Sequence, residues 1–104
     1  MDRMAKLKEY LEQNPADSFL LHALALEYVK QGDDEAARRY FEQLLAGEPG
    51  YVGSYYHLGK LLERVGEKEK AEETYGTGKK HAKAAGDNHA FNELQGALDD
   101  LLDN

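Results

Sequence analysis

Two stripes of apolar residues follow each other along the chain at helical spacings such as i, i+3, i+4 and i+7, which share one face of an α-helix. The first stripe consists of Leu21, Leu24, Ala25 and Tyr28. The second consists of Ala37, Phe41, Leu44 and Leu45. Between them stand Gly32, which can end a helix in the left-handed conformation, and Asp33, which can cap the next helix. The pattern predicts a helical hairpin.

The same order of large, small and turn residues returns 34 residues later. The equivalent pairs are Leu21 and Tyr55, Leu24 and Leu58, Ala25 and Gly59, Tyr28 and Leu62, Gly32 and Gly66, Glu35 and Glu69, Ala37 and Ala71, Phe41 and Tyr75, and Pro15 and Pro49. A fixed period of this length is typical of stacked helical repeats. We therefore expect a second hairpin. The small residues at positions 25, 37, 59 and 71 would let paired helices approach closely, with Phe41 and Tyr75 filling the space above them.

The flanking segments continue the pattern as half-repeats. Leu7, Tyr10, Leu11 and Pro15 precede their equivalents Phe41, Leu44, Leu45 and Pro49 by 34 residues. Phe91, Leu94, Leu98 and Leu101 follow Tyr55, Leu58, Leu62 and Val65 by 36 residues. We predict one domain over 1–104, made of a capping helix at 1–14, repeats at 16–49 and 50–83, and a second capping helix at 87–103. Because about three helix pairs are needed for a stable stack, the stack is expected to be complete.

These residues resemble the tetratricopeptide repeat, whose signature W-x2-L-G-x2-Y, A-x3-F, P is met as Leu21-x2-Leu24-Ala25-x2-Tyr28, Ala37-x3-Phe41, Pro49. The resemblance implies an all-α fold, an antiparallel helix-hairpin right-handed solenoid of about six helices. The second copy departs from the signature at Gly78 and Lys83, where alanine and proline are usual. Glycines 76 and 78 predict a weak or bent segment, unless the next helix packs closely against them.

In that family the first helices of successive repeats line a groove that holds extended peptides or partner helices. Carried onto this chain, the groove positions are Phe19, His22, Leu26, Val29, Lys30, Tyr56, Lys60, Glu63, Arg64, His89 and Asn92. They predict a partly apolar groove with a basic rim at Lys60 and Arg64, suited to an amphipathic or acidic-hydrophobic segment. Two alternatives stay open: a clamp for a C-terminal carboxylate, and ordinary surface packing.

Composition narrows the class of protein further. Twenty acidic residues against thirteen basic ones give a net charge of −7, which disfavours nucleic-acid binding. The absence of cysteine excludes thiol chemistry, and the charged N-terminus with no long apolar run indicates a cytoplasmic protein without membrane contact. The four histidines include no H-x3-H pair, so no metal is expected. No nucleophile stands beside a base and no glycine-rich phosphate loop occurs, so we expect neither cofactor nor enzyme.

The function predicted from the sequence is a protein- or peptide-binding adaptor module that uses the concave face of a short solenoid. The alternative is a self-assembling structural subunit, a homodimer through the unpaired N-terminal helix. Met1, Met4, Leu7 and Leu11 are expected to form the exposed apolar edge of that helix. At the other end, Asp99, Asp100 and Asp103 oppose the dipole of the last helix and form either a solvated terminus or an acidic docking edge.

Overall fold

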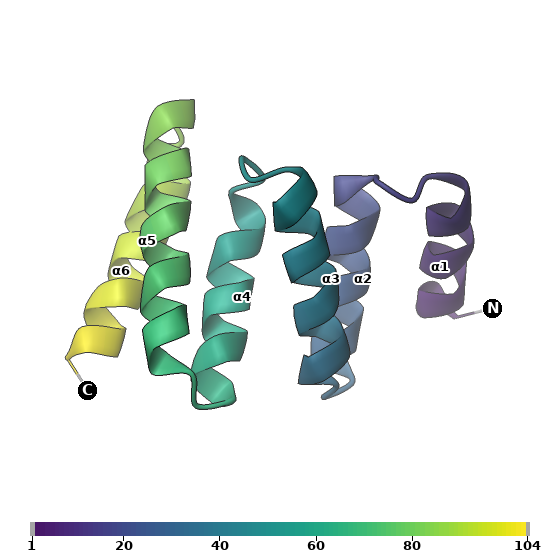
Figure 1. Ribbon diagram of the computed structural model, residues 1–104, viewed down its shortest axis with the longest axis horizontal. Coiled ribbons are helices and arrows are strands. Elements are labelled where there is room, and N and C mark those ends of the chain that lie inside the picture. The colour runs from purple at the N-terminus through teal and green to yellow at the C-terminus, as the bar shows by residue number, and fades with distance from the viewer. Residues whose placement is uncertain (1, 104) are drawn as a thin grey trace. The chain divides into compact units, whose positions relative to one another are not determined.

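The computed structural model describes residues 2–103, which form α-helices joined by short turns (Figure 1). The helices are α1 (Arg3–Gln13), α2 (Ser18–Lys30), α3 (Asp34–Gly47), α4 (Gly53–Arg64), α5 (Lys68–Ala85) and α6 (Asn88–Leu102). No strand occurs within residues 2–103. The predicted all-α class and the predicted number of helices are therefore confirmed.

The chain divides into two compact units, one up to Glu48 and one from Pro49 onward. In the first unit α2 packs against α3, and α1 packs against α2. In the second unit α5 packs against both α4 and α6, and α4 also touches α6. The division lies one residue before the predicted end of the first repeat at Pro49. The assignment of all 104 residues to one domain stays a prediction.

The core of the first unit includes Leu7 of α1 together with Ala23 and Leu24 of α2. Met4 and Leu11, on the same face of α1 as Leu7, are half-buried against this cluster. Leu7 itself is only 7% exposed. The expectation that these residues form an exposed edge is therefore wrong, because α1 turns its apolar stripe toward the next helix. Met1, which we grouped with them, lies outside the described residues.

The turns within the two hairpins begin alike and end differently. Gly32 and Gly66 both take positive φ values, +79° and +84°, as the predicted helix-ending glycines require. After Gly32 the carboxylate of Asp33 accepts a hydrogen bond from the amide of Ala36 at 3.1 Å, which caps α3. Glu67 holds the same position before α5, but its side chain makes no capping bond. The first hairpin therefore has the better helix start.

Close helix approach in the second unit depends on two glycines. A Cβ at Gly59 of α4 would lie 2.1 Å from a ring carbon of Tyr75 on α5. A Cβ at Gly78 would lie 2.6 Å from the Cβ of Tyr55, with Leu94 of α6 at 3.0 Å. Helix α5 runs without interruption through both Gly76 and Gly78. The exception allowed in our prediction therefore applies at Gly78, because α4 and α6 pack closely against it. No atom lies within 4 Å of a Cβ built at Gly76.

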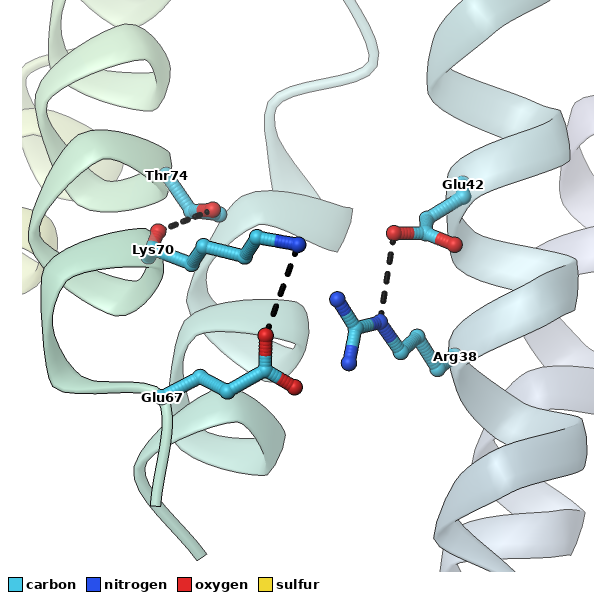
Figure 2. A network of polar contacts seen from close by, with 5 residues as sticks. All are labelled: Arg38, Glu42, Glu67, Lys70 and Thr74. Carbon is cyan, nitrogen blue, oxygen red and sulfur yellow. Dashed lines mark hydrogen bonds and ion pairs between the residues drawn. The ribbon is translucent and has the colours of Figure 1, made fainter. Parts of the chain in front are cut away.

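The charged faces of the second-half helices carry short-range polar contacts (Figure 2). On α5, the ammonium of Lys70 lies 3.4 Å from the carboxylate of Glu67, and the hydroxyl of Thr74 donates to the carbonyl of Lys70 at 2.7 Å. On α3, the guanidinium of Arg38 pairs with Glu42 at 3.2 Å. Such exposed pairs contribute little to stability, about 0.5 kcal/mol each. They agree with our interpretation of residues 67–73 as a solvated face.

Candidate partner-binding surface

In the first unit, four predicted groove residues occupy one face of α2. Phe19 is 67% exposed, which is high for a large apolar side chain. His22 and Leu26, one and two turns further on, are half-buried, and Lys30 ends the helix in an exposed position. The His22 ring stands edge-on to Phe41 with their centroids 5.9 Å apart, so the histidine also packs against the core. This face of α2 thus offers an apolar start and a basic end.

In the second unit, the predicted groove residues Tyr56, Lys60 and Glu63 of α4 form a connected chain of contacts. The ammonium of Lys60 lies 5.6 Å from the centroid of the Tyr56 ring, a cation–π distance. The same ammonium lies 3.7 Å from the carboxylate of Glu63. Glu63 in turn accepts a hydrogen bond from the hydroxyl of Tyr75 on α5. The predicted basic rim is therefore partly neutralised, because Glu63 holds the charge of Lys60 close to the helix.

The hydroxyl of Tyr75 links this surface to the core. The Tyr75 side chain is completely buried, and its hydroxyl reaches Glu63 at the edge of the core. Burial raises the pKa of Tyr75 above its ordinary value, and the neighbouring Glu63 carboxylate raises it further. Sequence reasoning treated Tyr75 as a packing residue and missed this bond. The sequence did contain a signal for this bond: the second repeat has Tyr75 where the first has Phe41. A tyrosine hydroxyl at a buried position needs a hydrogen-bond partner.

A second aromatic contact surrounds His57 on α4. Its ring stands edge-on to Tyr56, with the centroids 5.6 Å apart. Burial lowers the pKa of His57, and the nearby Glu93 carboxylate of α6 opposes that shift. The neutral histidine therefore serves as a packing partner of Tyr56. This agrees with our interpretation of His57 as a structural histidine.

The groove residues predicted on α6, His89 and Asn92, are both exposed in the first turns of that helix. Arg64 is exposed in the last turn of α4. The structure thus leaves the predicted positions accessible on α2 in the first unit, and on α4 and α6 in the second. Within residues 2–103, no group of three histidine, aspartate or glutamate side chains is placed to hold a metal ion. No described helix is long and apolar enough to span a membrane.

The chain consists of helix pairs in tandem, and the first helix of each pair has accessible side chains. This arrangement is typical of helical-repeat proteins that bind other proteins. A family model described as tetratricopeptide repeat matches residues 28–98, more than half of the chain. The chain belongs to the tetratricopeptide repeat family. It therefore has the helix-hairpin solenoid fold of a family that typically mediates protein–protein interactions and is generally non-catalytic.

Two solved structures and one curated protein show how this chain compares with known members. A crystal structure of a tetratricopeptide repeat domain protein from Salinibacter ruber has a TM-score of 0.79 and 40% identity, covering 82% of this chain and 94% of that one. The solution structure of a Bordetella parapertussis protein has a TM-score of 0.84 and 25% identity, covering 98% and 89%. Photosystem I assembly protein Ycf3 of Acaryochloris marina is 37% identical over 58 residues, 55% of this chain. The chain spans about a third of the length of that relative, 35%.

Proposed function

We propose that the chain is an adaptor that binds a protein or peptide segment on the exposed faces of its first-half helices. The observation that supports this proposal is the side chain of Phe19, which is 67% exposed on the predicted groove face of α2. A large aromatic that contributes little to the core has the properties of an interface anchor. Tyr56 on α4 supplies a second aromatic at the equivalent face, held in place by Lys60 and His57.

The chemistry of the two faces indicates the kind of segment that fits. Phe19 and Leu26 offer apolar contact in the first unit, with the cation of Lys30 beside them. In the second unit the Tyr56 ring offers apolar contact. The ammonium of Lys60 lies near both this ring and the carboxylate of Glu63. The favoured partner is therefore an amphipathic segment with apolar anchors and carboxylates at their flanks. A pure carboxylate clamp is less favoured, because Lys60 already has a carboxylate partner and Leu26 provides no donor.

The named role of a relative supports the class of function. The Acaryochloris relative is named a photosystem I assembly protein, and a role in assembly is consistent with the adaptor function proposed for this chain. The net charge of −7 supports a protein partner over nucleic acid, and the lack of cysteine supports the cytoplasm as the compartment. The alternative that two copies pair symmetrically through the apolar stripe of α1 loses its main support, since Leu7 is buried within its own unit.

The test compares two charge-matched variants in affinity capture from the native lysate. The groove variant carries Tyr56→Ala, Lys60→Glu and Arg64→Glu. The control carries Lys80→Glu and Lys83→Glu at exposed positions of α5, with the same change in net charge. We expect partners captured by the wild type to be lost by the groove variant and retained by the control. A Phe19→Ala variant should weaken binding of the purified partner about tenfold in calorimetry.

Two results would contradict the proposal. Partners retained equally by the wild type and by the groove variant would remove the α4 face from the binding surface. Partners lost equally by the groove variant and the control would show that only the overall charge matters. Circular dichroism of every variant should show the helical signal of the wild type, which ensures that lost binding does not reflect unfolding.

A further inference from the structure

A cavity lies at one end of the first hairpin, between the start of α2 and the end of α3. Its volume is about 260 Å³, and all of its lining residues belong to the first unit. Its walls include Pro15, Ser18, Leu21, Leu44, Gly47 and Glu48. Pockets that hold drug-sized ligands measure about 300–1,000 Å³. This cavity is therefore of a size to hold a single amino-acid side chain.

The second hairpin shows what fills the equivalent space when the residues differ. The shift of 34 residues relates Leu21 to Tyr55 and Gly47 to His81. The rings of Tyr55 and His81 are stacked, with their centroids 5.8 Å apart and their planes 11° apart. The Tyr55 hydroxyl also donates a hydrogen bond to the carbonyl of Pro49. Two planar rings and a hydrogen bond to a proline carbonyl thus occupy this place in the second unit.

The first hairpin has neither of these rings. Leu21 is shorter than a tyrosine, and nothing lies within 4 Å of a Cβ built at Gly47. Leu44, which stands at the position of Gly78, is almost fully buried and fills part of the space from the core side. Pro15, the equivalent of Pro49, lines what is left. The cavity therefore has room for a planar group beside a proline of the preceding turn.

The charges around the cavity favour a cation. Glu48 lines it, and the carboxylate of Glu48 accepts a hydrogen bond from the Ser18 hydroxyl at 2.7 Å. Helix α3 ends here with no basic residue in its last turn, and the negative end of a helix dipole attracts positive charge. At the start of α2 the carboxylate of Asp17 accepts from the amide of Leu20, which offsets the positive end of that helix. None of the lining residues is basic.

We propose that this cavity binds an arginine side chain of a partner protein. A guanidinium is planar, like the rings that fill the equivalent space in the second hairpin, and it carries the charge that Glu48 favours. Its several N–H groups can donate to the Glu48 carboxylate and to the carbonyl of Pro15 at the same time. The aliphatic stem of the arginine lies against Leu21 and Leu44. Lysine fits less well, because its ammonium is compact and not planar.

The arginine site is separate from the proposed adaptor surface, since it uses neither Phe19 nor Tyr56. Variants at Glu48 and Gly47 therefore test it without changing that surface, and a failure of either proposal leaves the other standing. A single side chain binds weakly, with a Kd in the range of about 1 mM. Nuclear magnetic resonance titration of the whole chain measures affinities of this size and also locates the site.

The titration uses Nα-acetyl-arginine amide as the probe and Nα-acetyl-citrulline amide as its neutral analogue of the same shape. We expect saturable shifts of the backbone amides of Ser18, Gly47 and Glu48 with the arginine probe. The citrulline probe should bind at least about fivefold more weakly, because it lacks the charge. Nα-acetyl-lysine amide should also bind more weakly, since it lacks the planar group.

Two variants test the charge and the space separately. Glu48→Gln should weaken binding of the arginine probe about tenfold, the usual effect of removing a charged hydrogen-bond partner. Glu9→Gln, an equal change of charge at an exposed position of α1, is its control and should bind like the wild type. Gly47→His restores the ring of the second repeat and should abolish binding at about pH 8, where an ordinary histidine is neutral. Its control is Gly96→His, because a Cβ at Gly96 also has nothing within 4 Å.

Three results would overturn the proposal. Shifts spread over the acidic surface without saturation at the three named amides would show only the general attraction of a cation to a chain of net charge −7. Equal binding of the citrulline or lysine probe would exclude recognition of a guanidinium. Unchanged binding in both Glu48→Gln and Gly47→His would place the probe outside the cavity. Circular dichroism of each variant shows whether the helical fold is kept.

Discussion

The hairpins of the two units fill the space between their helices with different residues. In α2 and α3 an alanine, Ala25, and a phenylalanine, Phe41, occupy equivalent positions and are both completely buried. In α4 and α5 the alanine is Gly59 and the phenylalanine is Tyr75, which adds a hydroxyl bonded to Glu63. Both hairpins thus place a small residue on the first helix and a large aromatic ring on the second, although the residues differ. The core ring of the second hairpin donates a hydrogen bond to a surface carboxylate, whereas Phe41 in the first hairpin has no hydroxyl to donate.

The largest difference in stability between the two hairpins should appear on substitution of the small residues Ala25 and Gly59. Gly59→Ala should lower the free energy of unfolding by about 3 kcal/mol, because the new methyl group would overlap the Tyr75 ring. The reverse change in the first unit, Ala25→Gly, should cost only about 1 kcal/mol, the usual difference in helix propensity. Urea unfolding followed by circular dichroism measures both.

Gly76→Ala is the matched control for a glycine change in the same unit, because nothing lies within 4 Å of a Cβ built at Gly76. It should be neutral or stabilise the protein by up to about 1 kcal/mol. A Gly59→Ala variant as stable as Gly76→Ala would show that Tyr75 can move away from the helix. In that case the two hairpins would not differ in tightness.

The second prediction concerns positions where both hairpins have alanine. Ala37 and Ala71 are completely buried, so Ala37→Leu and Ala71→Leu should each destabilise by about 2 kcal/mol through overpacking. Thermal unfolding at equal protein concentration would compare them. Equal losses would show that the hairpins share this contact, whereas a loss confined to one variant would place the looser packing in the other unit.

The third prediction uses the hydroxyl that only the second hairpin has. Tyr75→Phe should cost about 1 kcal/mol, since Glu63 loses a donor but stays accessible to water. The raised pKa of Tyr75 means that the folded state keeps the proton better than the unfolded state, whose value is about 10. This contribution is complete below pH 10 and is lost as the pH rises above it.

Stability measured between about pH 9 and 11 tests this sign. The wild type should lose more stability than Tyr75→Phe over this range, because the variant lacks the linked proton. Parallel pH profiles for the two proteins would show that the pKa of Tyr75 is not raised in the folded state. The two proteins differ only at position 75, so the difference between the profiles isolates that residue.

The smallest effect is expected at the helix starts. Asp33→Ala should destabilise by about 1 kcal/mol, because the amide of Ala36 loses its capping oxygen. Glu67→Ala should cost less than half of that, as Glu67 makes no capping bond to α5. Equal losses in chemical denaturation would mean that the side chain at position 67 stabilises the helix start in another way.

The sequence predicted the helices, their order and their main buried residues, because a 34-residue period constrains every apolar position twice. It predicted a weak or bent segment in α5 unless the next helix packed closely against the glycines there, and the structure has that close packing at Gly78. This packing is tertiary: Gly78 gives its space to Tyr55 and Leu94, which propensity alone cannot show. We also predicted that the apolar stripe of α1 is exposed. The sequence alone could not show which face of that helix packs against α2.

The sequence predicted which residues of the candidate surface are accessible. It predicted less well which contacts their charged groups make. Family resemblance placed Phe19 and Tyr56 on accessible faces, and the structure leaves Phe19 exposed and Tyr56 half-buried. It could not show that Lys60 is shared with Glu63, because such a contact depends on side-chain conformations. In the first repeat Val29 occupies the position of Glu63, and Phe41 occupies the position of Tyr75. The first repeat therefore has neither the hydroxyl nor the carboxylate of this hydrogen bond.

Within each unit, every helix packs against its neighbours along the chain. The contacts that stabilise each unit are therefore local, and little chain entropy is lost in bringing distant segments together before they form. Folding of such a topology is fast, in the range of microseconds to milliseconds for helical domains of this size. A newly made chain can complete its first hairpin while the second is still being synthesised, which shortens the time for which its apolar faces are exposed to aggregation.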